Sequence, residues 1–313
     1  MLKESLFYGK ILLFGEYGII QDSMGLSIPF DSYKGTLTFN QKDDVKASES
    51  NQHLQKFGAY LKDLQSSGEL LFTFDSSTFD KDMNNGLSFD SSIPQGFGVG
   101  SSGALVAAIY ERYATDKIEF SGQPNSGEIS DLKKIFGQME SYFHGKSSGL
   151  DPLICYLNLP VLIKSKENMG TVGLPEQDKQ GRGAIFLINS GSPGKTEPMV
   201  NIFMEKMKQE GFRNMLKKEF KKYNDACIQA FLKRDISPLF SNIKELSQLL
   251  LNNFTPMIPS VFHKLWKEGI ESNAYYLKLC GSGGGGYFLG FTQDLDQAKK
   301  KLKGYELEVV YSF

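Results

Sequence analysis

The residues best suited to chemistry in this 313-residue sequence begin with a glycine-rich segment, PQGFGVGSSG, at 94–103. Glycines let backbone N–H groups approach an anion closely, and a helix that starts directly behind them adds a favourable partial positive charge. Small and apolar residues at helical spacing follow in 103–114, with Ser101 and Ser102 as suitable N-cap residues. The segment predicts a loop that binds phosphate groups, with a tight structural turn as the alternative.

The same segment formally satisfies the dinucleotide fingerprint G-x-G-x-x-G through Gly98, Gly100 and Gly103, and Glu119 lies where a ribose-binding acid would be sought. That fingerprint should follow a buried parallel strand, whereas DSSIP at 90–94 is polar and ends in proline. Neither Gly-Lys-Ser nor Gly-Lys-Thr in this chain has the glycine five residues earlier that a P-loop needs. The pattern therefore disfavours both a Rossmann oxidoreductase and a P-loop enzyme.

Two further patterns carry chemical groups. Four consecutive glycines in KLCGSGGGGY at 278–287 lose much conformational entropy on folding, so close approach of a ligand or another loop is favoured over a plain linker. Glu140 and SSGLD at 147–151 supply the hard oxygens that a magnesium–phosphate site needs. An Asp behind Gly-Leu is by itself more often a turn or cap residue, so the last pattern depends on the others.

The elements that must position these residues follow from the hydrophobic periodicity. Strands are predicted at 7–14, 26–39, 70–75, 86–92, 184–189, 275–281, 287–291 and 305–313, and a partly strand-like apolar run at 153–163. Helices are predicted at 51–65, 103–114, 128–143, 199–233, 236–252, 257–271 and 294–304. This order is typical of an α+β fold with antiparallel sheets covered on one face. The polar segment 164–182 predicts a boundary near residue 178 between two domains, 1–178 and 179–313.

Composition narrows the class of protein. The sequence has 35 Lys and Arg against 36 Asp and Glu, a net charge of −1, so it lacks the basic excess of a general nucleic-acid or anionic-membrane binder. Hydrophobic residues at 40% and charged residues at 23% indicate a soluble globular protein. The longest uncharged run, 152–163, is too short to span a bilayer, and the N-terminal segment resembles a strand more than a signal peptide.

The cysteines and histidines give no metal signature. The three cysteines lie far apart, without the close pairs of zinc sites or disulfide frameworks, which fits a reducing cytoplasm: Cys155, Cys227 and Cys280. The three histidines are also scattered, and each alone is more often structural than catalytic: His53, His144 and His263. We expect none of these residues to bind a metal ion.

Together the three glycine and carboxylate patterns resemble the motifs of the GHMP kinase superfamily, named for galactokinase, homoserine kinase, mevalonate kinase and phosphomevalonate kinase. Segment 94–103 resembles Pro-x-x-x-Gly-Leu-Gly-Ser-Ser-Ala with Val99 for Leu and Gly103 for Ala, and 278–286 resembles Lys-Leu-x-Gly-Ala-Gly-Gly-Gly-Gly. GKILLFGEY at 9–17 and the segment 140–151 most resemble the mevalonate kinases, Gly-Lys-x-x-Leu-x-Gly-Glu-His and Glu-x-x-x-His-Gly-x-Pro-Ser-Gly-x-Asp. The resemblance covers essentially the whole chain.

The resemblance implies a two-domain GHMP kinase fold, with an N-terminal domain like domain 2 of ribosomal protein S5 and a ferredoxin-like C-terminal domain. It also implies an ATP- and Mg²⁺-dependent kinase that phosphorylates mevalonate to 5-phosphomevalonate in the route to isoprenoids. Phosphomevalonate kinase or another GHMP kinase is the alternative, the related decarboxylase is less favoured, and a non-catalytic ligand sensor on the same fold belongs to another class. A homodimer is left open.

Site residues follow from the same resemblance. Asp151 is implied to be the catalytic residue beside the substrate hydroxyl, with Lys10 close to it, and Ser102 and Glu140 are implied to hold Mg²⁺. The implied ATP-binding residues are Pro94, Gly96, Gly98, Val99, Gly100, Ser101 and Ser102. The implied acceptor contacts are Lys10, Glu16, Tyr17, Asp151, Gly283 and Gly284. Two positions depart from the mevalonate kinase pattern: Tyr17 stands in place of His and Ser147 in place of Pro.

Overall fold

The structure is a computed structural model that describes residues 5–39, 45–165 and 168–313. The first strand predicted from the sequence is present as β1 (Phe7–Phe14). Residues 1–4 of the predicted N-terminal segment and 166–167 of the predicted boundary segment lie outside the described residues. Two units are distinguished by their internal contacts. Unit 1 is formed by the described residues of Met1–Lys10, Pro29–Pro94 and Gly100–Leu159, and unit 2 by Ile11–Ile28, Gln95–Val99 and the described residues of Pro160–Phe313.

A five-stranded sheet has the order β1-β2-β4-β5, with β3 also paired to β2. Its strands after β1 are β2 (Gly25–Phe39), β3 (Leu87–Ser91), β4 (Val161–Ile163) and β5 (Met169–Thr171). The pairs β2–β3, β2–β4 and β4–β5 are antiparallel. Because β1 and β2 are long, each contributes residues to both units.

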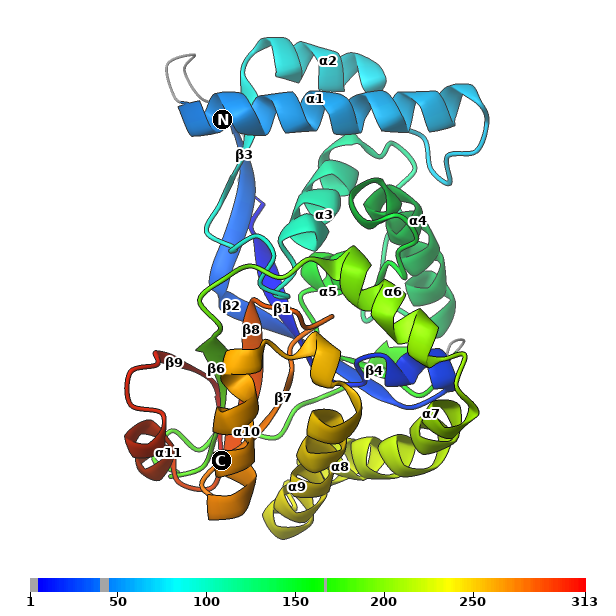
Figure 1. Ribbon diagram of the computed structural model, residues 1–313. Helices are drawn as coiled ribbons and strands as arrows, with labels where there is room; N and C mark the ends of the chain where they lie inside the picture. Colours follow the sequence, from blue (N-terminus) through cyan, green and yellow to red (C-terminus); the bar gives the residue numbers. More distant parts are fainter. Residues whose placement is uncertain (1–4, 40–44, 166–167) are drawn as a thin grey trace. The chain divides into compact units, whose positions relative to one another are not determined.

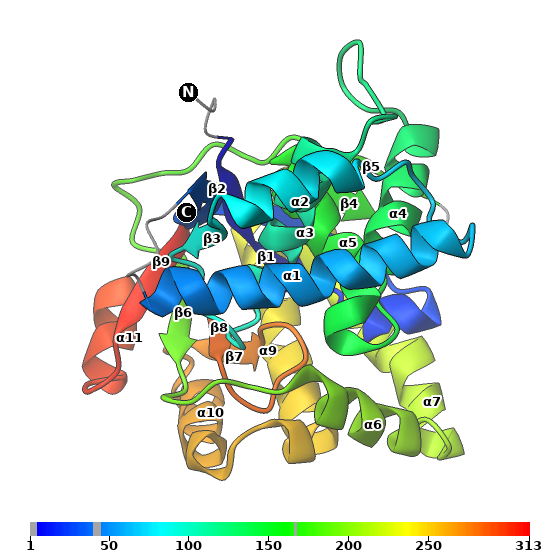
Figure 2. The same ribbon diagram turned by 90° about the horizontal axis from the view of Figure 1, so that it is seen from above.

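Helices supply most of unit 1: α1 (Val45–Ser66), α2 (Ser76–Asn84), α3 (Ser101–Tyr113), α4 (Ser126–His144) and α5 (Leu150–Leu157). α1 and α2 lie side by side, and α3 packs against both α4 and α5 (Figures 1 and 2). α4 begins with a capping box in which Asn125 and Glu128 satisfy each other's backbone N–H groups. α3 is fully buried along much of its length, at Val106, Ala107 and Ile109 among others. These contacts fix the ends of α3, α4 and α5, where the predicted site residues lie.

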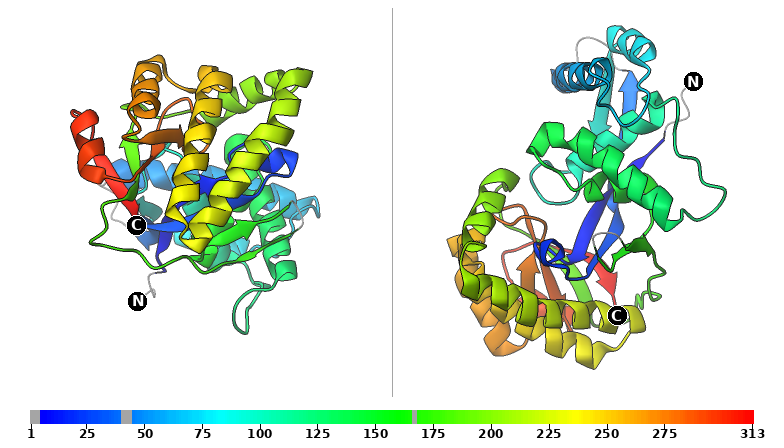
Figure 3. Two further views of the ribbon diagram at one scale, coloured as in Figure 1. Left: turned by 90° about the horizontal axis from the view of Figure 1, so that it is seen from below. Right: turned by 90° about the vertical axis from the view of Figure 1, so that its right-hand side faces the viewer.

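Unit 2 contains a four-stranded antiparallel sheet of order β7-β8-β6-β9. Its strands are β6 (Ala184–Asn189), β7 (Tyr276–Leu279), β8 (Tyr287–Thr292) and β9 (Leu307–Ser312). The helices of this unit are α6 (Thr196–Lys206), α7 (Glu210–Met215), α8 (Lys221–Lys233), α9 (Ile236–Asn253), α10 (Ser260–Ser272) and α11 (Leu295–Lys301), with short helical segments at Gly18–Gln21, Leu216–Phe220 and Thr255–Met257. α9 and α10 pack on β7, and α8 and α9 lie side by side (yellow in Figure 3).

The predicted α+β class is confirmed, but three element predictions are wrong. The single helix predicted at 199–233 is interrupted at 207–209, between α6 and α7. Residues 70–75 form no strand but only an isolated bridge between Phe74 and Ala114, and the unpredicted α2 follows, capped by Asp75. The strand-like run 153–163 begins instead with α5. Five of the eight residues of α5 are buried and Asp151 is its only charged residue, so its sequence lacks the charged stripe that would mark a helix. Within the described parts of the chain, no helix is long and apolar enough to cross a membrane.

Candidate active site

The glycine segment turns sharply into α3. Gly96, Gly98 and Gly100 have φ angles of +79°, +79° and +89°, a region that residues with a side chain rarely adopt. α3 begins at Ser101, with Gly100 as its N-cap. The expectation that Ser101 or Ser102 caps the helix is wrong, because the left-handed conformation of Gly100 starts the helix earlier and places both serines in the first turn. Since Gly100 has no side chain to cap the helix, the first-turn N–H groups suit an anion.

An ion pair between a buried lysine and a partly exposed aspartate lies in unit 1, between β1 and α5. The Nζ atom of Lys10 is 2.8 Å from Oδ2 of Asp151, which stands in the first turn of α5. The Lys10 side chain is 2% exposed and that of Asp151 is 38% exposed. The glycine at position 100 makes room for this lysine, since a Cβ atom there would lie 2.9 Å from Cγ of Lys10. The arrangement presents a carboxylate to solvent while a buried cation holds it from behind.

A second acidic group, Glu140 near the end of α4, is held by two serines. Its Oε1 accepts a hydrogen bond from Oγ of Ser102 at 3.0 Å, and its Oε2 accepts one from Ser147. Burial and, to a smaller extent, the charge of Asp151 raise the pKa of Glu140, the two serine hydrogen bonds and Lys10 oppose the rise, and the net pKa is about 7. The hydroxyl of Ser147, which replaces the proline of the family motif, thus helps to hold this carboxylate.

Mg²⁺ fits the pair formed by Ser102 and Glu140. Both supply hard oxygen atoms, and Mg²⁺ in phosphate sites usually takes few protein ligands because it keeps waters and shares phosphate oxygens. A buried carboxylate with a raised pKa would also gain from a nearby cation. Among the described residues, no group of three or more His, Cys, Asp or Glu side chains could hold a metal ion by itself.

His144 is a site residue that the sequence analysis set aside. Its Nε2 lies 3.0 Å from Oγ of Ser102, so one serine hydroxyl contacts both Glu140 and His144. Burial lowers the pKa of His144, and the charge of Asp151 opposes this shift. The spacing held a signal: residues 140 and 144 are one helical turn apart, which places both side chains on the same face of α4.

In unit 2, the predicted site residues Glu16 and Tyr17 both bind the segment around β7. The Glu16 carboxylate pairs with the ammonium of Lys278, and both side chains are buried. Tyr17 has a φ of +58°, donates a hydrogen bond of 2.8 Å to the carbonyl of Ser282, and stacks on Phe203 with ring centroids 4.5 Å apart. The hydroxyl of Tyr17, where the family motif has His, is therefore engaged by the glycine run itself.

The glycine run 281–286 is closely approached by other backbone segments of unit 2, as predicted. A Cβ atom at Gly286 would lie 2.7 Å from Cα of Phe97, and one at Gly285 would lie 2.8 Å from the carbonyl oxygen of Ser192. A Cβ atom at Gly283 would lie 2.7 Å from the carbonyl oxygen of Met257, whereas one at Gly284 would meet the side chain of Met199. Val99, another predicted site residue, is fully buried.

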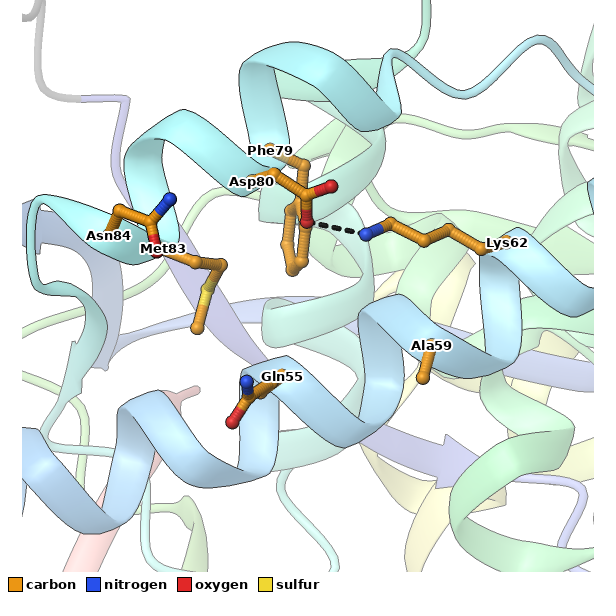
Figure 4. Close-up of a pocket in the computed structure, with 7 residues that line it drawn as sticks. All are labelled: Gln55, Ala59, Lys62, Phe79, Asp80, Met83 and Asn84. Carbon is orange, nitrogen blue, oxygen red and sulfur yellow. Dashed lines mark hydrogen bonds and ion pairs between the residues drawn. The ribbon is translucent and has the colours of Figure 1, made fainter.

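A separate groove of about 440 Å³ lies between α1 and α2 in unit 1 (Figure 4). Gln55, Lys62, Asp80 and Met83 are among its lining residues, and Lys62 pairs with Asp80 across it. None of the predicted site residues lines this groove.

The raised pKa of Glu140 predicts a pH-dependent stability. The unfolded carboxyl has a pKa near 4.5, so the folded chain binds this proton more tightly and loses stability as pH rises from about 4.5 to 7. Glu140→Gln cannot ionise and should escape this loss. As pH rises from 5 to 8 without divalent cations, the free energy of unfolding of Glu140→Gln minus that of the wild-type protein should increase by about 1–3 kcal/mol. Denaturant unfolding at each pH measures it, and a pH-independent difference would show that Glu140 ionises normally in the folded chain.

Comparison with known proteins places this geometry in a family. Family models match the chain at two places: "GHMP kinases N terminal domain" at residues 69–158 and "GHMP kinases C terminal" at 227–305. A search of curated protein sequences gave no significant match.

Solved structures with a similar fold include three kinases of low sequence identity. L. major mevalonate kinase, in complex with R-mevalonate, has a TM-score of 0.62 and 14% identity over 100% of this chain and 97% of that chain. Streptococcus pneumoniae phosphomevalonate kinase, in complex with phosphomevalonate and AMPPNP, has a TM-score of 0.62 and 13% identity over 99% and 100%. Lactococcus lactis galactokinase, complexed with galactose, has a TM-score of 0.63 and 12% identity over 99% and 94%. With both domain models matched over more than half of its length, the chain belongs to the GHMP kinases, a family of small-molecule kinases.

Proposed function

We propose that this chain is an ATP-dependent kinase that transfers the γ-phosphoryl group to the hydroxyl of mevalonate, giving 5-phosphomevalonate. One observation carries the proposal: the ion pair of Lys10 and Asp151 lies close enough to Glu140 for both charges to affect its pKa. Glu140 in turn accepts a hydrogen bond from Ser102, in the first turn of α3. An acid–base group, a cation and a metal-binding pair are the parts that phosphoryl transfer to an alcohol requires.

The acceptor hydroxyl is placed against Asp151 in this proposal. The carboxylate accepts the hydroxyl proton as the acceptor oxygen forms its bond to the γ-phosphorus and the bond from that phosphorus to the bridging oxygen of ATP breaks, releasing ADP. Lys10, buried behind the carboxylate, keeps Asp151 in place for that proton transfer. Glu16, Tyr17, Gly283 and Gly284 are the further proposed acceptor contacts.

The nucleotide is assigned to the glycine segment. The proposed phosphate contacts are Pro94, Gly96, Gly98, Val99, Gly100, Ser101 and Ser102. The three glycines of this segment have positive φ angles, and the segment leads into the N-terminus of α3, which suits an anion. Ser102 and Glu140 would hold Mg²⁺, which when bound neutralises charge on the phosphate oxygens. The S. pneumoniae relative, solved with AMPPNP, supports a nucleoside triphosphate as the phosphoryl donor.

Mevalonate is favoured over other acceptors by two sequence segments and one structural relative. Residues 9–17 and 140–151 resemble the mevalonate kinase motifs, and the L. major relative was solved with R-mevalonate. Phosphomevalonate is the second candidate, because the S. pneumoniae relative holds it on a fold of equal TM-score.

We also propose a catalytic N-terminal domain at 1–178 and a C-terminal domain at 179–313, since each matched family model falls within one of them.

An acceptor screen tests the substrate assignment. ADP release should be measured with Mg·ATP and, in turn, mevalonate, phosphomevalonate, homoserine and galactose. We expect the highest kcat/KM with mevalonate. A higher value with another acceptor would contradict the substrate assignment and leave the kinase assignment intact. Absence of ADP release with every acceptor would contradict the kinase assignment and favour a ligand sensor.

Substitution of the acid–base residue tests the mechanism. Asp151→Asn keeps the shape of the side chain and removes its charge, so kcat should fall by about 10²–10⁴-fold. The Kd of ATP, measured by calorimetry, should stay within about twofold, because the nucleotide contacts lie on other residues. Asp131→Asn is the matched control, since it makes the same change at an exposed ion pair on α4 and should leave kcat unchanged. A near-normal kcat in Asp151→Asn would make Asp151 a turn residue only.

A further inference from the structure

We propose that Gly103 is a positioning residue that sets the place of Asp151, an inference that rests on the proposed function for its catalytic consequence. Gly103 is buried in the first turn of α3, directly after Ser102. Its φ is not positive, so its backbone conformation would accept any residue. A glycine inside a helix is less stable than alanine by about 0.5–1 kcal/mol. Helix formation alone would therefore favour alanine here, and another constraint must explain the glycine.

That constraint is the peptide group that joins Asp151 to Pro152. A Cβ atom at position 103 would lie 2.9 Å from the carbonyl carbon of Asp151, 2.9 Å from the nitrogen of Pro152 and 3.1 Å from the Asp151 oxygen. Cβ atoms in proteins do not approach backbone atoms this closely, and a peptide group cannot rotate away as a side-chain end can. The missing side chain of Gly103 therefore lets the first turn of α5 rest on α3.

The first turn of α5 has little freedom to adjust on its own. The ring of Pro152 restricts the backbone, and Leu150, Leu153 and Ile154 are buried around it. A Cβ atom at Gly149, directly before α5, would lie 2.0 Å from the carbonyl oxygen of Lys133, so α4 confines the segment as well. A methyl group at position 103 must consequently displace the segment that carries Asp151.

Such a displacement would act on the ion pair with Lys10. The Asp151 carboxylate stands 2.8 Å from the ammonium of Lys10, and Lys10 itself is held in β1 with its stem against Gly100. Moving Asp151 by a few tenths of an ångström to one ångström shifts the base relative to the acceptor hydroxyl. Misplacement of a catalytic group on this scale can lower a rate by up to about 100-fold.

Close approach to backbone is not general among the helical glycines of this chain, although a Cβ atom at Gly269 in α10 would lie 2.6 Å from the carbonyl oxygen of Tyr275. A Cβ atom at Gly211 in α7 would meet no atom within 4 Å, and one at Gly137 in α4 would come no closer than 3.3 Å to the carbonyl oxygen of Ser147. The motif that 94–103 resembles has Ala at the position of Gly103. In this chain, we infer, that alanine would be harmful because of the Asp151–Pro152 peptide.

The test is Gly103→Ala, with Gly211→Ala as the matched control. Gly103→Ala should lower kcat by about tenfold or more, with the acceptor that the wild-type protein uses, while the Kd of ADP stays within about twofold. Gly103→Ser should lose as much or more. Gly211→Ala should keep the wild-type kcat and an equal or higher Tm, because alanine stabilises a helix where space is open. Wild-type kcat in Gly103→Ala would overturn the proposal.

Two further measurements separate positioning from lost folding and from a wrong function. If Gly103→Ala unfolds below the assay temperature, kinetics are repeated where circular dichroism shows it folded, and recovery of wild-type kcat there would overturn the proposal. Hydrogen–deuterium exchange should be faster in 150–157 of the variant and unchanged in α9, at 236–253, which belongs to unit 2. This exchange needs no acceptor, so it tests the contact even if the wild-type protein phosphorylates none. Unchanged exchange in 150–157 would show that a side chain at position 103 does not displace the Asp151–Pro152 peptide, and would overturn the proposal.

Discussion

A lysine ammonium with almost no solvent contact must have a fixed anionic partner, and this requirement governs the arrangement of unit 1. The side chain of Lys10 is 2% exposed, and Ile11 and Leu13 of the same strand, β1, are fully buried. Its partner is Asp151, from a helix 141 positions later in the sequence. Removing the charge of Asp151, which is partly exposed, would take the carboxylate away from a buried ammonium, and an uncompensated buried charge lowers stability. Two close approaches make this pairing possible: that of α3 to Lys10 and α5, through Gly100 and Gly103, and that of the segment before α5 to α4, through Gly149.

The second consequence is electrostatic. Glu140 stands close enough to Asp151 for each negative charge to oppose the other, and burial adds to the effect. Two serine hydroxyls and Lys10 lower the energy of the charged form without restoring the usual pKa. Unit 1 therefore concentrates negative charge around one buried lysine, at the end of a helix whose first-turn N–H groups suit an anion. A cation and a polyphosphate bound together would complement both features.

The sequence could predict those parts of this arrangement that depend on local pattern. The strand at 7–14 and the helices at 128–143 and 236–252 have clear periodicity, and the glycine runs at 94–103 and 281–286 marked close backbone approaches. α5 could not be recognised, because it is short and Asp151 is its only charged residue, which leaves an apolar run without a clear helical period.

Contacts between residues far apart in the sequence also could not be predicted from local sequence patterns. The bond between Ser102 and His144 joins residues 42 positions apart, so the one-turn spacing of Glu140 and His144 could place the histidine on the same helix face but could not identify its serine partner. Tyr17 was expected at the acceptor, but its positive φ and its bond to Ser282 follow from the packing of unit 2. The role of Gly103 likewise depends on which peptide group lies against it. Sequence patterns could therefore name the residues of the site more readily than the contacts among them.

The most direct test of this account is a double-mutant cycle on kcat for Lys10→Met and Asp151→Asn. If the two residues act as one unit, each single variant should lose most of the rate, and the double variant should be at most a few-fold slower than the slower single one. If the losses instead multiply in full, Lys10 and Asp151 work independently and the ion pair is not the centre of the chemistry.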